Sequence, residues 1–248
     1  MFYIKELIRI TFSLALSCLF FFNLPAQDSI QPKLFVRIGY GSQSTIHSDL
    51  SKRYGQHGTL SLGINFIKHH WETGPAIGFL FGSNVREDVL ASLRSADGEL
   101  IGSDHQLAEV DLNMRGMMIG WSILRKIKLS TQSFFLVGLQ PVWLSHWIRF
   151  QNPGNSFEPI QGNYRYGYDR LSSGLAIEES LTYRFQSNNR LLNLELAFTA
   201  MQGNSSLRRN IQLDNPSVKK TSSSGFIGFQ ARWLVPIFPA KKAEKIFY

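Results

Sequence analysis

Cysteine is nearly absent from this chain of 248 residues: Cys18 is the one cysteine, and it lies in the first segment. A chain with a single cysteine forms no internal disulfide and offers no site built from several thiolates. The six histidines do not supply a metal site either, because no two have the i, i+4 spacing of a helix site or the i, i+2 spacing of a strand site. We therefore expect no metal and no cofactor.

Long hydrophobic runs are equally scarce. The apolar run Ile10–Phe22 follows two basic residues and is short for a bilayer span, and Leu24-Pro25-Ala26 then ends on a small residue. This pattern predicts a cleaved signal peptide at 1–26 and a mature domain at 27–248. Cys18 could instead accept a lipid, but cleavage there would leave an apolar new N-terminus. No later run reaches 18 apolar residues, which excludes a helical membrane protein.

Acidic residues are in the minority. The chain has 26 Lys and Arg against 18 Asp and Glu, so its formal net charge is +8, and it would be +7 without the predicted signal peptide. An exported basic chain meets anionic lipid, polysaccharide or another envelope protein rather than nucleic acid. We expect outer-membrane lipid or lipopolysaccharide as a partner, other envelope proteins as further partners, and no nucleic acid.

What the sequence does have is a hydrophobic period of two. In Trp71–Gly82, for example, the odd positions are mostly apolar or aromatic and the even positions are mostly glycine or alanine. Eight such two-faced segments occur. They are Leu34–Tyr40, Thr59–Lys68, Trp71–Gly82, Glu109–Ser122, Phe134–Phe150, Leu171–Phe185, Leu191–Met201 and Gly225–Ile237.

The polar gaps between these segments alternate between long and short. The long gaps are Gly41–His57, Ser83–Ala108, Gln151–Arg170 and Gln202–Ser222, and the short gaps are His69–His70, Arg125–Gln132 and Gln186–Arg190. Brief turns on one side and extended loops on the other are typical of outer-membrane barrels. The pattern predicts an all-β fold: a closed, antiparallel, up-and-down transmembrane β-barrel of eight strands, with long extracellular loops and short periplasmic turns.

A soluble β-sandwich or lipocalin-like barrel is the structural alternative. Such folds bury their apolar face and expose a polar one to water. Here the second face consists mainly of Gly, Ser, Ala and Thr, which suits a crowded lumen better than a water-facing sheet. Aromatic residues near the segment ends suit the interface girdles of a membrane barrel. They are Tyr40, Phe66, Trp71, Phe81, Trp121, Trp147, Tyr183 and Trp233.

Three positions disturb the alternation. The apolar phase slips near Gly116, which predicts a bulge there. Pro141 lies inside a long segment and predicts a bulge or a local break in the strand ladder. Strict alternation turns Glu179 toward lipid, so we expect either a bulge that re-aims it or a partner at that place.

Several ionisable residues fall on the small face: Arg37, Glu72, Asp111, Arg115, Glu178, Glu195 and Arg232. An eight-stranded barrel has no open channel, so charges inside it must pair with each other. We expect a structural network of salt bridges in the lumen. A proton path or a catalytic pair of carboxylates is the alternative, but no spacing selects it.

The gaps hold a second set of charges. The gap at Gln202–Ser222 is basic, with Arg208, Arg209, Lys219 and Lys220 against Asp214, whereas the gap at Ser83–Ala108 is acidic. Opposite charges on neighbouring loops could pair, or could bridge lipid headgroups and a basic partner. The first gap contains His47 and Asp49 and the second contains His105, which would be the residues of a surface enzyme that modifies lipid or polysaccharide. No nucleophile motif supports that alternative.

Four segments resemble small outer-membrane β-barrel proteins of Bacteroidota, of the OmpA/OmpX/OmpW-like type. They are the signal that ends Pro25-Ala26-Gln27, the stretch Gly167–Ala176, the stretch Gly203–Arg209 and the closing Trp233–Phe238. The resemblance implies a non-enzymatic structural or adaptor component of an envelope or secretion (type IX-like) assembly, with no catalytic residues. It also draws attention to Tyr168, Asp169 and Arg170, where a charged pair would clamp a loop to its strand. A narrow porin for small solutes is a further alternative.

Overall fold

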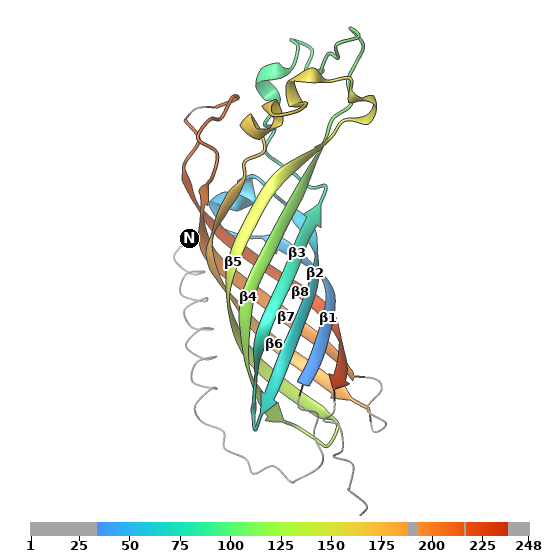
Figure 1. The fold of residues 1–248 in the computed structure, drawn as a ribbon, viewed down its shortest axis with the longest axis vertical. Helices are drawn as coiled ribbons and strands as arrows, with labels where there is room; N and C mark the ends of the chain where they lie inside the picture. The colour runs from blue at the N-terminus through green and yellow to red at the C-terminus, as the bar shows by residue number, and fades with distance from the viewer. Residues whose placement is uncertain (1–33, 188–192, 216, 238–248) are drawn as a thin grey trace, which may run out of the picture.

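The computed structural model describes residues 34–187, 193–215 and 217–237, and in these its strands close into one barrel (Figure 1). The strands are β1 (Leu34–Thr45), β2 (Gln56–Lys68), β3 (Trp71–Gly82), β4 (Asp111–Lys128), β5 (Ser133–Gln151), β6 (Ser172–Gln186), β7 (Asn193–Leu207) and β8 (Thr221–Ile237). Each pairs antiparallel with its neighbour in sequence, and β8 pairs with β1. The predicted closed, eight-stranded, up-and-down barrel is confirmed. The predicted signal peptide lies outside the described residues.

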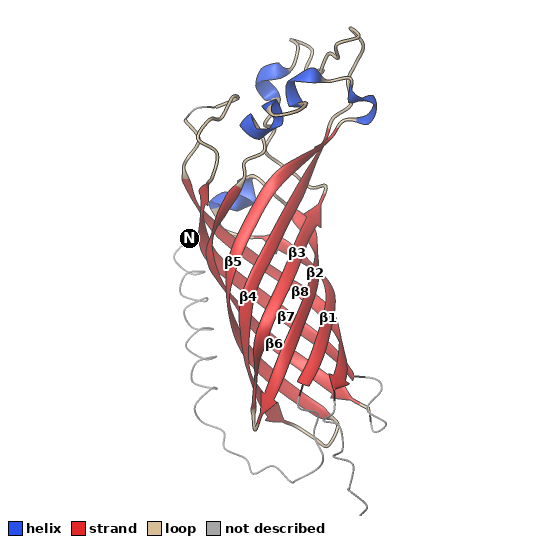
Figure 2. Ribbon diagram, viewed as in Figure 1, coloured by secondary structure: helices blue, strands red, loops and turns tan. Residues whose placement is uncertain are grey.

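Long and short connections leave opposite ends of the barrel. At the end that we call the loop end, the strands are joined by L1 (46–55), L2 (83–110), L3 (152–171) and L4 (208–220). At the other end, the turn end, β2 and β3 are joined by 69–70, and β4 and β5 by 129–132. Short 3-10 helices gather at the loop end, where L2 and L3 rise above the rim (Figure 2). They are η1 (Asp49–Lys52), η2 (Ala91–Leu93), η3 (Pro153–Asn155), η4 (Glu158–Ile160) and η5 (Tyr164–Gly167).

The strands are longer than the hydrophobic pattern predicts. β1 continues to Thr45 and β7 to Leu207, so L1 and L4 begin later than the polar gaps suggest. β4 continues to Lys128, which shortens its turn. Backbone hydrogen bonds do not require apolar side chains, so the ladders extend beyond the hydrophobic band at both ends. No helix among the described residues is long and apolar enough to span a membrane.

The two faces of the barrel wall differ in polarity as the alternation predicts. On β3, Phe79 points outward and is 39 % exposed, whereas Leu80 beside it points inward and is 1 % exposed. The same holds on β7, where Leu196 is 65 % exposed and its neighbour Ala197 is buried. Large apolar side chains thus cover the outer wall, in an arrangement that is the reverse of a water-soluble barrel.

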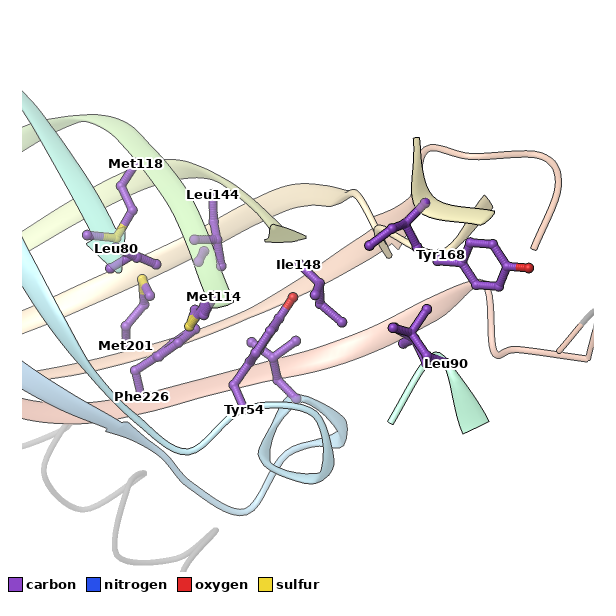
Figure 3. Packing of buried hydrophobic residues seen from close by; sticks show 14 of the residues in the cluster. Tyr54, Leu80, Leu90, Met114, Met118, Leu144, Ile148, Tyr168, Met201 and Phe226 are labelled. Carbon is purple, nitrogen blue, oxygen red and sulfur yellow. The ribbon is translucent and has the colours of Figure 1, made fainter. Parts of the chain in front are cut away.

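Buried side chains occupy both halves of the lumen, but the two halves are built differently. The loop half is an apolar core to which several strands contribute, and this core continues into side chains of the loops, of which Leu90 and Tyr168 lie to the right in Figure 3. The strand residues labelled in Figure 3 are Leu80, Met114, Met118, Leu144, Ile148, Met201 and Phe226, and the loop residues are Tyr54, Leu90 and Tyr168. The turn half holds buried charges, described below.

The predicted bulge at Gly116 is wrong. The registers of β4 with β3 and with β5 run through Gly116 without an inserted residue. Met114 points inward, so Asp111 and Arg115 lie on the outer wall of β4 and not in the lumen, contrary to the prediction. The error has a physical cause: the loop half of the lumen is itself apolar, so an apolar side chain there does not mark the outer face.

The other two irregular positions have different outcomes. Pro141 has no backbone N–H, and the β4–β5 pairing lapses at Trp121 and Ser122, opposite Pro141 and Gln140, which confirms a local break in the ladder. Glu179 faces outward from the middle of β6 in an unbroken register, between Leu139 and Ala200. No bulge re-aims it.

Candidate functional site

A cluster of charges fills the turn half of the lumen, centred on Arg184 of β6. Arg184 is fully buried and donates two hydrogen bonds to Glu72, at 2.6 and 2.7 Å, and one to Glu195, at 2.8 Å. Arg37 lies beside them, with its Nε 3.1 Å from a Glu195 oxygen and its Nη2 3.8 Å from a Glu72 oxygen. Strand alternation points these four side chains inward near the turn end of their strands, and closure of the barrel brings them to one place.

Arg232 and Glu178 extend this cluster toward the middle of the barrel. Arg232 Nε donates to Gln230 Oε1 at 3.0 Å, and both Arg232 and Glu178 are buried. The three arginines Arg37, Arg184 and Arg232 thus face the three glutamates Glu72, Glu178 and Glu195, and Lys126 of β4 adds a further positive charge that Glu72 attracts. Buried charges that satisfy each other act as a structural unit, since each would be costly alone. Arg184 was not among the predicted residues, although it shares the inward phase of Glu178.

A second arginine-centred network ties the loops together over the mouth. Arg170 of L3 is 1 % exposed; its Nε donates to Glu87 of L2 at 2.8 Å, and its Nη1 to Gln212 and Asp214 of L4 at 2.6 and 2.8 Å. Arg53 of L1 donates to the other Glu87 oxygen at 2.6 Å. We call Arg53, Glu87, Arg170, Gln212 and Asp214 the mouth network. Every outer loop contributes to it.

Neighbouring arginines lower the pKa of Glu87 in this network. Burial alone would raise the pKa of the Glu87 carboxyl, but the guanidinium groups of Arg53 and Arg170 hold that pKa below its ordinary value. Arg170 adopts a positive φ of 54°, and its side chain donates to Glu87 of L2 and to Asp214 of L4. The prediction that this residue clamps a loop to its own strand is too narrow, because it joins three loops.

The remaining loop residues singled out from the sequence lie around this network. Asp169 accepts a hydrogen bond from Arg209 at 2.8 Å, and Tyr168 packs in the apolar core. Arg208 donates to Ser173 and stacks 5.4 Å from the Trp143 ring. Lys219 forms a salt bridge with Asp49 at 2.8 Å, and the Lys220 side chain is exposed.

A buried polar layer lies within the loop half of the lumen, beside Tyr54 of the apolar core. His146 of β5 is completely buried, its Nε2 lies 3.3 Å from Ser205 Oγ, and its ring meets the Tyr54 ring edge-on. Ser205 in turn contacts Ser222 and Ser224, each at 3.3 Å. Sequence reasoning missed this layer, because its members are distant in the chain and only the closed barrel brings them together.

An open groove of about 870 Å³ lies beside the mouth, between the outer end of β5 and L3. Trp147, Arg149 and Phe150 of β5 line one side, and Arg165 and Tyr166 of L3 line the other. Arg209 stacks 4.2 Å from the Tyr166 ring and Arg165 stacks 5.0 Å from it. The groove thus combines aromatic rings with closely spaced guanidinium groups.

The residues considered for metal binding and for an enzyme lie in different surroundings. No group of three or more His, Cys, Asp and Glu residues could hold a metal ion within the described ranges. Asp49 is occupied by Lys219 and by Ser223, whose backbone N–H donates to it at 3.1 Å. The lipid-modifying enzyme with His47, Asp49 and His105 stays a prediction.

Comparison with known proteins finds similar barrels at low similarity. Neisserial surface protein A matches with a TM-score of 0.42 and 11 % identity over 81 % of this chain and 96 % of that one. The attachment invasion locus protein Ail of Yersinia pestis matches with a TM-score of 0.41 and 11 % identity over 83 % of this chain and 99 % of that one. OprG from Pseudomonas aeruginosa matches with a TM-score of 0.40 and 8 % identity over 83 % of this chain and 97 % of that one. No family model and no curated protein matches the sequence. Function has to be argued from the residues.

Proposed function

We propose that this chain is an integral outer-membrane protein with a closed lumen, which serves as a rigid, non-enzymatic scaffold or adaptor in an envelope or secretion assembly. One observation carries the membrane location: the outer wall is apolar around the barrel while buried charges occupy its interior. Outward Leu62, Phe198 and Trp233 are each more than a third exposed. In water, an apolar surface of this extent would aggregate.

The direction of insertion follows from the connections. Transmembrane barrels place long loops outside the cell and short turns in the periplasm. L1 to L4 would therefore face outward, and the strand ends Leu34 and Ile237, which pair with each other at the turn end, would face the periplasm. The mouth network would then lie at the cell surface.

A scaffold accounts for the interior better than a porin does. Arg184, Leu136 and Leu144 point into the lumen and are each no more than 1 % exposed. A salt-bridge cluster and an apolar core thus stand in series along the barrel axis. The mouth network adds a cover whose loops are joined by charge-assisted hydrogen bonds, and a surface held in one shape before binding loses less entropy when a partner docks.

Membrane integration is tested by fractionation and by gel mobility. The protein should sediment with outer membranes and should migrate differently before and after boiling, because a folded barrel resists detergent. After insertion into planar bilayers it should give no steady ion conductance. A soluble product or a missing mobility shift would refute the membrane location, and steady conductance would refute the closed lumen.

The adaptor role needs a separate experiment. Affinity purification in mild detergent from native envelopes should recover a stable partner protein with the wild type. An Arg170→Ala variant, which loses the hydrogen bonds from L3 to Glu87, Gln212 and Asp214, should lose that partner, whereas Arg94→Ala should keep it. Arg94 is a suitable control because it is an exposed L2 arginine that pairs with Asp88, outside the network. A barrel that always purifies with lipid alone would contradict the adaptor role.

A further inference from the structure

The groove beside the mouth has more positive charge than its own residues neutralise. Arg209 pairs with Asp169, but within the described part of the chain neither Arg149 nor Arg165 forms a salt bridge. Arg115 lies on the same outer wall, on the neighbouring strand, and its charge and that of Arg149 repel each other. An unbalanced group of guanidinium ions next to a cavity is an arrangement that favours an anion.

The arginines of the groove are held in place before any ligand arrives. Arg165 Nη2 donates to the Tyr166 hydroxyl at 3.2 Å, and both Arg165 and Arg209 stack on that ring. Arg149 projects from a strand, next to Trp147, rather than from a free loop. Planar guanidinium groups bind phosphate oxygens in pairs, and fixing them beforehand reduces the entropy lost on binding.

The position of the groove on the wall indicates where the anion comes from. Trp143 and Leu175 pair across β5 and β6, point outward, and are 44 % and 69 % exposed. They form the apolar wall that leads up to Trp147, and Arg208 stacks over Trp143 at its upper edge. Tryptophan and arginine at the end of an apolar wall mark the headgroup level of a membrane.

We infer that this groove binds the phosphorylated sugar headgroup of an outer-leaflet glycolipid, with Arg149, Arg165 and Arg209 on the phosphate and the acyl chains along Trp143 and Leu175. The inference rests on the proposed outer-membrane location. A volume of about 870 Å³ accommodates a sugar phosphate. A soluble anionic polysaccharide would need no apolar wall below the charges, so the glycolipid is the better match.

The test uses the full mature protein folded into phosphatidylcholine vesicles that contain either bisphosphorylated lipid A or its dephosphorylated form. Native mass spectrometry after extraction counts the lipid A retained on the barrel. The phosphorylated form should be retained, and the Arg149→Gln/Arg165→Gln variant should retain it about tenfold less well or worse. The control Lys52→Gln/Lys220→Gln removes the same charge from exposed side chains outside the groove and should bind like the wild type.

Three results would overturn the inference. They are equal retention of both lipid forms, wild-type retention by the arginine variant, and displacement of the lipid by inorganic phosphate at the same phosphate concentration. The gel mobility shift on boiling is measured on every sample. A barrel that shows the shift and retains no lipid A refutes the glycolipid site alone, whereas a missing shift in the wild type refutes the proposed membrane location.

Discussion

Two arginines, Arg184 and Arg170, have nearly the same surroundings, but strands hold the first in place and loops hold the second. Each is no more than 1 % exposed, and each donates to two carboxylates from other parts of the chain. Arg184 and its partners lie on strands, in a register that the whole ladder fixes. Arg170 and its partners lie on loops. We therefore expect the first cluster to persist as long as the barrel is folded, and the second to open while the barrel stays folded.

The largest effect is expected in the lumen. Arg184→Ala leaves Glu72 and Glu195 buried with too little compensating charge, which should lower the free energy of unfolding by about 3–5 kcal/mol. Denaturant titration of the barrel in vesicles measures this change. Replacing Arg37, Arg184, Glu72 and Glu195 together by Met and Leu should cost much less, because the two arginines and the two carboxylates that pair with them are then removed together. A single variant as stable as the wild type would contradict the account.

At the mouth, Arg170→Ala should destabilise the protein less than Arg184→Ala does, and only in the outer loops. Glu87 is partly exposed and keeps its salt bridge with Arg53. We therefore expect the free energy of opening the mouth network to fall by about 1–3 kcal/mol, with the gel mobility shift unchanged. Limited proteolysis of vesicles should show faster cleavage in L3 and L4. If the same variant abolished the mobility shift, the mouth would not be separable from the barrel.

Acid should open the mouth selectively. The folded-state pKa of Glu87 lies below its ordinary value of 4.5, so the stabilisation is complete above that pH and is lost as pH falls through the lower folded value. Proteolysis of L3 and L4 should therefore accelerate below about pH 4.5. A Glu87→Gln variant should be cleaved faster at neutral pH and should lose most of this pH dependence. Equal acid sensitivity in both proteins would show that another group is responsible.

The smallest effect is expected outside both networks. Asp111 is exposed on the outer wall near the rim, so Asp111→Asn should change the free energy of unfolding by no more than about 0.5 kcal/mol. The same denaturant titration measures it alongside Arg184→Ala. A loss comparable to that of Arg184→Ala would mean that Asp111 belongs to the lumen cluster after all.

Strand alternation predicts the inward residues of the turn half but not all of those of the loop half. The period of two placed Arg37, Glu72 and Glu195 on the inner face, because side-chain direction along a strand depends only on sequence parity. It failed at Asp111 and Arg115, where apolar Met114 fills the lumen and polarity no longer distinguishes inside from outside.

No sequence pattern predicts the pairing within the mouth network. Glu87 and Arg170 are 83 positions apart and meet only because the barrel brings L2 and L3 together. The sequence indicated that the gaps at Ser83–Ala108 and Gln202–Ser222 carry opposite charges and that Arg170 holds a loop, but not which groups would pair. The groove was missed for the same reason, since Arg149, Arg165 and Arg209 come from one strand and two loops.

The most direct test of the central claim asks what surrounds the outer wall. In a Cys18→Ser background, Leu196→Cys places a thiol on the apolar outer face and Arg94→Cys places one on an exposed loop. On intact cells, a membrane-impermeant maleimide should label the Arg94→Cys variant and leave Leu196→Cys unlabelled until the membrane is dissolved and the protein unfolded. Labelling of Leu196→Cys in folded protein on intact cells, or in a soluble fraction, would show that water rather than lipid covers the wall, and would contradict the account.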